Sequence, residues 1–360
     1  MTDRDYMKLA LEEAVKGEGY VSPNPMVGAV IVKDGRIIAK GYHHRYGDLH
    51  AERDALKNCT ENPEGATMYV TLEPCCHQGK QPPCTQAVIE SGIRRVVTGS
   101  GDPNPLVGGK GIAILKNSGI EVTENVLEEE CLKLNEIFFH YIKTGQPFVT
   151  MKYAMTMDGK IAAYTGKSKW ITGELSRENV QRTRHKYSGI MVGVGTVLAD
   201  DPMLNCRMEG GKDPTRIICD TNLRTPLDAK IVQTAKDIPT ILAVSCDDEK
   251  IRQFENYGCK VLKLPQKNGH VDLQTLMKKL GELKIDSILL EGGAELNWSA
   301  LESEIVNKVQ TYISPKLLGG SGKSPVGGVG AESPDSAFGL TEPEIYYFGE
   351  DIMIESRVRY

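Results

Sequence analysis

The sequence predicts an α/β protein made of two consecutive domains. Apolar runs of strand length alternate with stretches of helical periodicity along most of the chain, which is typical of sheets covered by helices. The chain has 360 residues, too many for one ordinary domain and suitable for two. A helix stop followed by a proline, Gly145-Gln146-Pro147, marks the best boundary. We therefore expect domains at residues 1–146 and 147–360.

The first half alternates strand and helix patterns. Asp34-Gly35 between two apolar runs predicts a β-hairpin, and Gly92, Gly119 and Gly145 each follow a helical pattern that a glycine would end. The expected strands are Val27–Val32, Arg36–Tyr42, Thr67–Leu72 and Arg94–Ser100. The expected helices are Asp3–Lys16, Ala51–Cys59, Pro83–Ser91, Ile112–Asn117 and Leu127–Lys143. This order favours an α/β sandwich with a mixed sheet.

The second half begins as a new α/β unit at Phe148. Its expected strands are Phe148–Ala154, Ile190–Val194, Arg216–Asp220, Pro239–Val244, Lys260–Leu264, Ser287–Leu290, Lys308–Ile313, Ile345–Phe348 and Ile352–Val358. Its expected helices are Glu174–Tyr187, Asp248–Tyr257 and Asp272–Leu283. The stretch Gly319–Pro334 is rich in glycine, serine and proline, which predicts a mobile loop before the closing pair of strands.

Composition and charge exclude several classes of function. With 40% hydrophobic and 25% charged residues, the chain resembles a soluble globular protein. Its net charge of −5 disfavours nucleic-acid partners, whose phosphates are usually bound by a basic excess. No apolar run approaches the roughly 18 residues of a membrane span, and the N-terminus lacks a signal-peptide pattern. Nine cysteines, most of them scattered, predict reduced thiols in the cytoplasm.

One cluster of residues is typical of a catalytic zinc site. His50-Ala51-Glu52 is followed by Pro74-Cys75 and, beyond an eight-residue insert, by Cys84. One imidazole and two thiolates suit zinc and leave a coordination position for water, whose pKa the metal lowers towards about 7. Zinc deaminases use His-x-Glu and Pro-Cys in this way, with the glutamate carrying protons. We expect His50, Cys75 and Cys84 to hold zinc and Glu52 to be catalytic.

Two readings of this cluster stay open at this point. A closed structural zinc site would need a fourth ligand, which Cys76 or His77 could supply, and three unrelated buried residues would need no metal. The insert at residues 76–83 is polar, which suits a loop folded over a small anionic substrate, but a solvated loop would look the same. Its length also departs from the Cys-x-x-Cys of most nucleic-acid and nucleoside deaminases.

Longer stretches around these residues resemble one known family, the bifunctional deaminase–reductases of riboflavin biosynthesis. The stretches that resemble its deaminase half are Ser22–Gly28, Gly47–Glu52, Val70–Cys75 and Asp102–Pro105. Those that resemble its reductase half are Met157–Ala162, Ser168–Thr172, Gly193–Thr196, Asp200–Pro202 and Pro315–Gly320. The resemblance spans nearly the whole chain and keeps the order of the two halves.

The resemblance implies both folds and both reactions. The N-terminal domain would be a cytidine-deaminase-like three-layer α/β/α domain, and the C-terminal domain a dihydrofolate-reductase-like α/β domain. With zinc, the first would remove the pyrimidine 2-amino group of 2,5-diamino-6-ribosylamino-4(3H)-pyrimidinone 5′-phosphate. With NADPH, the second would reduce the ribosyl chain, giving 5-amino-6-ribitylamino-uracil 5′-phosphate. We also expect a homo-oligomer, although no feature of the sequence sets the number of subunits.

By similarity, four residues would hold the base and the ribose phosphate in the deaminase half: Asn24, His43, His77 and Lys80. Asn24 lies between two prolines and is therefore a rigidly aimed amide, whereas His43 could equally be a surface histidine at a strand end. The chain departs from the family pattern in two places. Cys76 stands where the family usually has serine, and Arg53-Asp54 replaces a more usual Val-His.

The reductase half carries a weaker signal in its residues alone. Strand Ser287–Leu290 leads into a glycine turn and a helix, which suits a phosphate cradle or a plain tight turn, and Gly-x-Gly-x-x-Gly is absent. The family resemblance implies cofactor contacts at Ala154, Trp170, Thr196, Asp200, Thr221, Gly292, Gly293, Ala294, Glu295, Leu296, Asn297 and Trp298. It implies substrate contacts at Ser168, Arg184, Leu204, Arg207 and Glu291, with Lys152 and Asn205 as plausible neighbours. The guanidinium forks of Arg184 and Arg207 suit a phosphate, though Arg184 could also be a solvated helix residue.

Two other functions fit part of the sequence. One is a zinc deaminase acting on a nucleoside or nucleic-acid base, with an accessory C-terminal nucleotide-binding domain. The insert between the cysteines, the acidic net charge and the long second domain count against it. The other is a non-catalytic binding protein with a structural zinc, which would leave Glu52 without a role.

Overall fold

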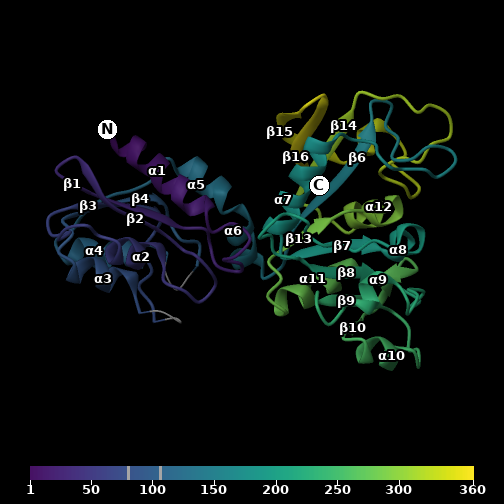
Figure 1. Ribbon diagram of the computed structural model, residues 1–360, viewed down its shortest axis with the longest axis horizontal. Helices are drawn as coiled ribbons and strands as arrows, with labels where there is room; N and C mark the ends of the chain where they lie inside the picture. The colour runs from purple at the N-terminus through teal and green to yellow at the C-terminus, as the bar shows by residue number, and fades with distance from the viewer. Residues whose placement is uncertain (79–81, 105–107) are drawn as a thin grey trace. The chain divides into compact units, whose positions relative to one another are not determined.

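The chain forms two compact units, Met1–Gly145 and Gln146–Tyr360 (Figure 1). The computed structural model describes residues 1–78, 82–104 and 108–360. The break between the units falls where Gly145 ends a helix with φ 68°, a left-handed conformation that glycine adopts without strain. Pro147 follows, and the first strand of the second unit begins at Phe148.

The first unit contains a mixed sheet, as the sequence predicts. Its helices are α1 (Asp3–Val15), α2 (Ala51–Lys57), α3 (Cys84–Glu90), α4 (Lys110–Asn117), α5 (Glu128–Leu134) and α6 (Glu136–Thr144). Its strands are β1 (Gly28–Lys33), β2 (Arg36–Tyr42), β3 (Thr67–Leu72), β4 (Arg95–Ser100) and β5 (Glu121–Thr123). Within the described part of the unit the strand order is β2-β1-β3-β4-β5. β1 runs antiparallel to β2 and β3, whereas β3, β4 and β5 are parallel.

Helices cover both faces of this sheet and make three layers (Figure 1). Because successive side chains of a strand point to opposite faces, β1 contributes to two cores. Val30 and Val32 pack with residues of α1 and α5, while Ala29 and Ile31 pack with residues of α2, α3 and α4. The strand is buried on both faces, which explains its continuous apolar run.

The helix expected over Leu127–Lys143 is wrong in one respect, because the structure divides it into α5 and α6. Asn135 lies between them with φ −107° and ψ 22°. Its buried side chain accepts a hydrogen bond from Met26 N at 2.8 Å and donates one to Met26 O at 2.9 Å. This pair of bonds to a distant backbone outweighs the continuation of the helix, and local periodicity could not predict it.

The second unit is built on one large sheet. Its strands are β6 (Phe148–Thr156), β7 (Gly189–Gly193), β8 (Thr215–Cys219), β9 (Thr240–Val244), β10 (Lys260–Lys263), β11 (Gln266–Lys267), β12 (His270–Val271), β13 (Ser287–Leu290), β14 (Lys308–Ser314), β15 (Gly339–Phe348) and β16 (Asp351–Arg359). Its helices are α7 (Glu174–Lys186), α8 (Val194–Asp200), α9 (Lys230–Gln233), α10 (Ile251–Asn256), α11 (Leu273–Glu282), α12 (Ala294–Glu302) and the 3₁₀ turn η1 (Pro334–Ser336). The main sheet has the order β10-β9-β8-β7-β13-β6-β14-β16-β15.

In this sheet order, all the strands from β10 through β9, β8, β7, β13 and β6 to β14 are parallel. The C-terminal hairpin β15–β16 pairs with β14 through β16, in antiparallel orientation. As in the first unit, a central strand contributes side chains to two hydrophobic cores, one on each face of the sheet. On β7, Met191 packs with residues of α11 and α12, whereas Ile190 and Val192 pack with residues of α8, α9 and α10. The carboxyl ends of β7, β8 and β13 therefore meet at one edge of the sheet, which is where ligands bind in open α/β sheets.

Among the remaining differences, β15 begins at Gly339 and not at Ile345 as expected, and five short elements were missed. β5, α8, α9, β11 and β12 were not expected, because elements of two to seven residues hold too little periodic pattern to detect. Gly319–Pro334 contains no strand or α-helix, which agrees with the expected loop. No helix in the described ranges combines the length and the apolar composition that crossing a membrane requires.

Candidate active sites

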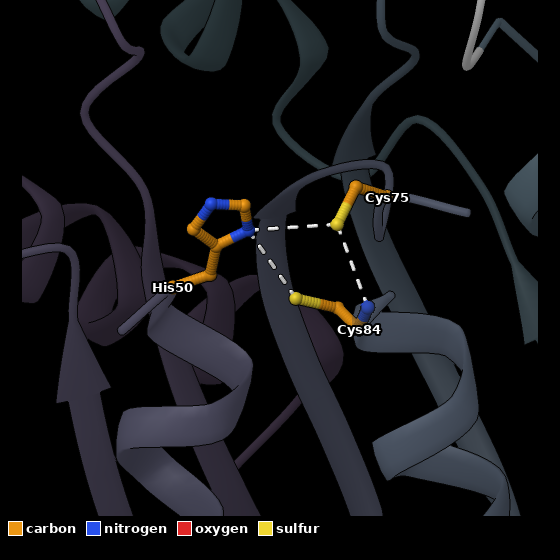
Figure 2. A group of neighbouring side chains, drawn as sticks. All are labelled: His50, Cys75 and Cys84. Atoms are coloured by element: carbon orange, nitrogen blue, oxygen red, sulfur yellow. Dashed lines mark hydrogen bonds between the residues drawn. The ribbon is translucent and has the colours of Figure 1, made fainter. Parts of the chain in front are cut away.

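Three predicted zinc ligands meet in the first unit, each at the end of an element. His50 is the N-cap of α2, Cys75 follows β3, and Cys84 is the first residue of α3. Figure 2 shows the imidazole turned towards both sulfurs, with His50 Nδ1 3.5 Å from Cys75 Sγ and 3.4 Å from Cys84 Sγ. Of the residues described, only these three place metal-ligating atoms within 4.8 Å of one another as a group.

The surroundings of the sulfurs suit a metal that binds thiolates. Hydrogen bonds from Cys84 and His50 lower the pKa of the Cys75 thiol despite its burial, whereas the hydrogen bond to Cys75 and burial raise the pKa of the Cys84 thiol, so without a metal the two sulfurs share one proton. The backbone N–H of Cys84 also donates to Cys75 Sγ at 3.4 Å, as Figure 2 shows. One imidazole nitrogen and two sulfurs at this spacing fit zinc.

Glu52 lies beside the three ligands, in the first turn of α2. Its side chain is only 3% exposed and hydrogen-bonds Cys84. Burial raises the pKa of the Glu52 carboxyl to about 7. A carboxyl group with this pKa can both take up and release a proton near neutral pH, which is what a general acid–base catalyst requires.

Asn24 and His43 form a second polar group next to the ligands. His43 is 2% exposed, so the reading of it as a surface histidine is wrong. Its Nδ1 lies 2.9 Å from Leu49 O, which can only accept, so Nδ1 carries the proton. Its Nε2 therefore accepts from Asn24 Nδ2 at 3.1 Å, which leaves Oδ1 as the acceptor end of the Asn24 amide. The His43 and His50 rings are 5.4 Å apart, which links this pair to the ligands.

The segment after Cys75 holds the residues that could have closed the metal site. Neither Cys76 nor His77 joins the ligand group within the described ranges. His77 Nδ1 is buried and has no hydrogen-bond partner among the described residues. A buried, unpaired ring nitrogen is costly unless a ligand or water binds it. Lys80, expected at the substrate phosphate, lies outside the described residues.

Glu73 was not among the predicted site residues, yet it anchors the segment that carries Cys75. It is 3% exposed, and its carboxylate accepts backbone hydrogen bonds from Gly109 at 2.9 Å and Gly111 at 2.9 Å. The carboxylate thus lies at the N-terminus of α4, where a negative charge is stabilised. The available signals were its place two residues before a predicted ligand and its position in Val70–Cys75, a stretch that resembles the family's deaminase half.

In the second unit, an ion pair joins α7 to the end of β13. Arg184 Nε and Nη2 donate to Glu291 Oε1 and Oε2 at 2.7 and 2.9 Å, and Nη1 donates to Asn205 O at 2.9 Å. Burial alone would raise the pKa of Glu291, but the charges of Arg184 and Lys152 lower it to about 2. Burial lowers the pKa of the Lys152 ammonium. Arg184 is therefore a partly buried, paired residue and not a solvated one.

The glycine turn after β13 forms as expected and leads into α12. Gly292 has φ 96°, and Gly293 is the N-cap of the helix, with its N–H 3.4 Å from Thr196 Oγ1. Beside this turn is a cavity of about 370 Å³ at the carboxyl ends of β7 and β8. Thr221, Glu295 and Leu296 line it. This volume lies in the range of small-molecule and cofactor sites.

Comparison with known proteins decides the family. Residues 147–354 match the model of the RibD C-terminal domain, and residues 1–100 match that of the cytidine and deoxycytidylate deaminase zinc-binding region. The riboflavin biosynthesis protein RibD of Actinobacillus pleuropneumoniae is 57% identical, over 99% of this chain and 95% of its own. The chain belongs to the RibD family. RibD of Aquifex aeolicus is 44% identical, over 98% of this chain and 97% of its own.

Solved structures of RibD proteins share the whole fold. Acinetobacter baumannii RibD has a TM-score of 0.90 at 35% identity, and the Thermotoga maritima deaminase/reductase a TM-score of 0.89 at 38% identity. Each alignment covers 99% of both chains. The expected folds, cytidine-deaminase-like followed by dihydrofolate-reductase-like, are therefore confirmed. As a RibD protein, the chain is a bifunctional deaminase and reductase of riboflavin biosynthesis, with a zinc-binding region and a reductase domain for NAD(P)H.

The other reductase residues expected in this RibD chain lie in several places. Ala154 is on β6, Asp200 ends α8 with Lys169 Nζ 3.8 Å away, and Trp170 is exposed with the Arg177 guanidinium over its ring. Ser168 lies in the loop before α7, and buried Leu204 and exposed Arg207 flank Asn205. On α12, Ala294 O accepts from Gly327 N, Asn297 Nδ2 donates to Pro325 O, and Trp298 packs on Phe338. These three hold the 325–338 segment.

The cavity also reveals residues that sequence reasoning missed. Arg224 and His270 line it together with Gly195. Gly195 lies inside the stretch that resembles the RibD reductase half, whereas Arg224 and His270 carried no signal. They come from the loop after β8 and from β12, so only the folded sheet brings them to α12.

Proposed function

We propose that this RibD chain converts 2,5-diamino-6-ribosylamino-4(3H)-pyrimidinone 5′-phosphate to 5-amino-6-ribitylamino-uracil 5′-phosphate in two steps. Residues 1–146 would carry out the deamination and residues 147–360 the reduction. The observation that carries the proposal is the grouping of His50, Cys75 and Cys84 beside a buried glutamate whose pKa is about 7. The names of solved relatives describe the same pair of activities.

In the deamination, His50, Cys75 and Cys84 would hold zinc, which supplies a water acidified for attack on the amidine carbon of the pyrimidine. The Glu52 carboxylate takes a proton from the attacking water and delivers it to the ring nitrogen. A second proton passes through Glu52 to the amino group, which leaves as ammonia while the carbonyl forms. A carboxyl group with a pKa of about 7 suits both transfers.

The substrate would be oriented by the polar residues around this centre. The acceptor end of the Asn24 amide faces a donor of the base, because His43 already occupies its nitrogen. The unpaired Nδ1 of His77 is suited to a polar group of the substrate. Lys80, which lies outside the described residues, would add a positive charge for the ribose phosphate. This arrangement selects a small phosphorylated pyrimidine over a nucleic acid.

In the reduction, NADPH would supply hydride to C1′ of the open-chain ribosylamine. In its open-chain form the ribosylamine is an imine at C1′. Burial lowers the pKa of Lys152, so its ammonium is a suitable proton donor to the nitrogen of this imine. Glu291 is held ionised by Arg184 and therefore orients rather than donates. The remaining substrate contacts would be Ser168, Leu204, Asn205 and Arg207, with Arg207 facing the phosphate.

The cofactor would lie along the carboxyl ends of the strands, where Thr221, Glu295 and Leu296 line the cavity. The backbone N–H groups at Gly293 and the start of α12 suit the pyrophosphate. The other proposed contacts are Ala154, Trp170, Thr196, Asp200, Gly292, Ala294, Asn297 and Trp298. Arg224 at the cavity favours NADPH over NADH, because a guanidinium can bind a 2′-phosphate. We also propose that the enzyme acts in the cytoplasm as a homo-oligomer.

Incubation of the full-length enzyme with the diaminopyrimidinone phosphate, followed by mass spectrometry, tests the proposal. Without a nicotinamide cofactor we expect the deaminated product and released ammonia only. With NADPH we expect the deaminated and reduced product. Release of ammonia from cytidine or single-stranded DNA, with none from the pyrimidinone, would contradict the substrate. Equal rates with NADH would contradict only the cofactor preference.

A further inference from the structure

The eight residues between Cys75 and Cys84 end in two prolines, Pro82 and Pro83, directly before the second ligand. Proline has no backbone N–H, so the backbone of Pro82 and Pro83 can accept hydrogen bonds but cannot donate them. Pro83 is also the N-cap of α3, so its position sets where the helix and its first residue begin. Whatever binds these carbonyls therefore affects the placement of the Cys84 sulfur.

Arg53 binds both carbonyls. It lies on α2, next to Glu52, and its Nε donates to Pro82 O at 3.1 Å while its Nη2 donates to Pro83 O at 2.8 Å. The guanidinium group is planar, so two bonds from one fork fix the direction as well as the distance of the acceptors. The side chain crosses from the helix that begins after His50 to the start of the helix that begins with Cys84.

We propose that Arg53 is a positioning residue of the metal site, which holds the start of α3 so that Cys84 meets His50 and Cys75 at zinc-binding distance. The inference rests on the proposed ligand set. Two other bonds, from Cys84 N to Cys75 Sγ at 3.4 Å and from Thr85 N to Cys75 O at 3.1 Å, link Cys75 to the first two residues of α3. Arg53 adds the link to α2, which carries His50 and Glu52.

The opposing explanation is that Arg53 binds the phosphate of the substrate, as an arginine near an anionic ligand often does. Its two bonds to proline carbonyls favour the positioning role, because they engage the fork that would otherwise bind phosphate oxygens. The two roles predict different measurements. A positioning residue changes the affinity for zinc in the absence of substrate, whereas a phosphate ligand changes KM and leaves zinc binding alone.

The test compares full-length Arg53→Met and Arg53→Lys with the wild type and with Lys57→Met. Lys57 is an exposed residue of the same helix, so its replacement removes one positive charge without touching the prolines. Zinc affinity is measured by competition with a chromophoric chelator, and the melting temperature of each zinc-free protein is recorded alongside. Losses of partners that orient metal ligands commonly weaken metal binding by roughly 10- to 100-fold.

We expect Arg53→Met to bind zinc about tenfold more weakly, Arg53→Lys to lie between it and the wild type, and Lys57→Met to match the wild type. The zinc-free melting temperature of Arg53→Met should fall only slightly, because one of the two lost hydrogen bonds is exposed. Unchanged zinc affinity in both Arg53 variants would overturn the proposal, whether KM rises or the zinc-free protein is destabilised. A failure of the proposed function can be distinguished from a failure of this proposal. In the first case the wild type itself would not bind one zinc ion per chain or would not release ammonia.

Discussion

At the scale of single residues, the deaminase centre is made from side chains at the ends of elements. His50 precedes α2, Cys84 begins α3, and Cys75 follows β3. The first N–H groups of a helix have no partner inside the helix and can stabilise a negative charge beside them. The bond from Cys84 N to Cys75 Sγ is an instance of this effect. These positions let a short stretch of backbone both aim a ligand and stabilise its thiolate form.

Replacement of any one zinc ligand by alanine should release the metal and abolish ammonia formation. Cys84→Ala is the most direct case, because its sulfur is buried and lies 3.4 Å from His50 Nδ1. Zinc content by atomic absorption and ammonia release are the measurements. Cys76→Ser serves as the matched control and should be nearly silent, since Cys76 lies outside the ligand group in the described structure. Normal zinc and turnover in Cys84→Ala would refute the ligand set.

Glu52→Gln should keep zinc and lose deamination. Glutamine has nearly the same size but cannot carry a proton, and general acid–base catalysis contributes roughly 10²- to 10⁴-fold to a rate. We therefore expect kcat for ammonia release to fall by at least about 10²-fold with zinc content unchanged. Reduction of pre-deaminated substrate is the internal control and should not change. A loss of zinc together with activity would instead make Glu52 a structural residue.

At the scale of elements, the proposed reductase centre depends on how β13 and α7 are held together. Arg184 on α7 binds the Glu291 carboxylate through two nitrogens, directly after the strand ends. Lys152 on the neighbouring strand β6 adds a second positive charge to the same carboxylate. Charges with little exposure to water are costly unless they are paired. Removing Arg184, Glu291 or Lys152 would therefore leave the remaining charges without full compensation.

Glu291→Gln should destabilise the second unit at neutral pH and much less in acid. The folded-state pKa of Glu291, about 2, lies below its ordinary value of 4.5. The stability that this shift contributes is therefore present above pH 4.5 and is lost as the pH falls towards 2. The shift corresponds to about 3 kcal/mol at pH 7. Urea unfolding at pH 7 and pH 3 gives the free energy of unfolding of the wild type and the variant. We expect the difference between these two free energies to be smaller at pH 3 than at pH 7.

The matched control for this prediction is Glu342→Gln. Glu342 pairs with Arg357 at 3.1 Å, but its side chain is 72% exposed, and exposed pairs of this kind contribute little. We expect its free energy of unfolding to stay close to the wild-type value at both pH values. A loss of stability in Glu291→Gln that is the same at pH 3 as at pH 7 would show that the charge of Glu291 is not the cause.

At the scale of the whole molecule, the two sets of catalytic groups belong to separate units. The described residues contain one group of potential metal ligands, and it lies entirely within the first unit. The cavity and the partly buried Arg184–Glu291 ion pair lie entirely within the second. Each unit also has its own hydrophobic cores. Each unit therefore carries its own set of candidate catalytic groups.

Removal of zinc should abolish deamination and spare reduction. Enzyme stripped with a chelator is expected to reduce pre-deaminated substrate with NADPH at close to the wild-type rate, because hydride comes from the cofactor and no metal is needed. The fall in NADPH absorbance over time gives the rate of reduction, and circular dichroism checks that the fold is intact. Loss of reduction that zinc restores, with the fold unchanged, would show that the two sites are coupled.

Much of the fold could be predicted because the strands and helices of both units carry clear periodicity. The strand Ser287–Leu290 and the hairpin strand Arg36–Tyr42 have the predicted bounds. Misses came where a distant contact overrode the local pattern. Asn135 interrupts a predicted helix because its amide binds the backbone of Met26, a residue 109 positions away. The short elements β5 and α9 hold too few residues to show a period.

The sequence by itself predicted His50, Cys75 and Cys84 as metal ligands and the α/β class, because the ligands lie in recognisable motifs and the elements carry local periodicity, whereas the structure left Cys76 and His77 out of the ligand group in the described ranges. Only the tertiary structure decided that His43 is buried, that Arg184 pairs with Glu291, and that Arg53 binds the carbonyls before Cys84. These contacts join residues far apart in the chain, and Arg184 and Glu291 are separated by 107 positions. Local propensity cannot predict such contacts, because their free energy depends on burial and on geometry that exist only after the sheets have formed.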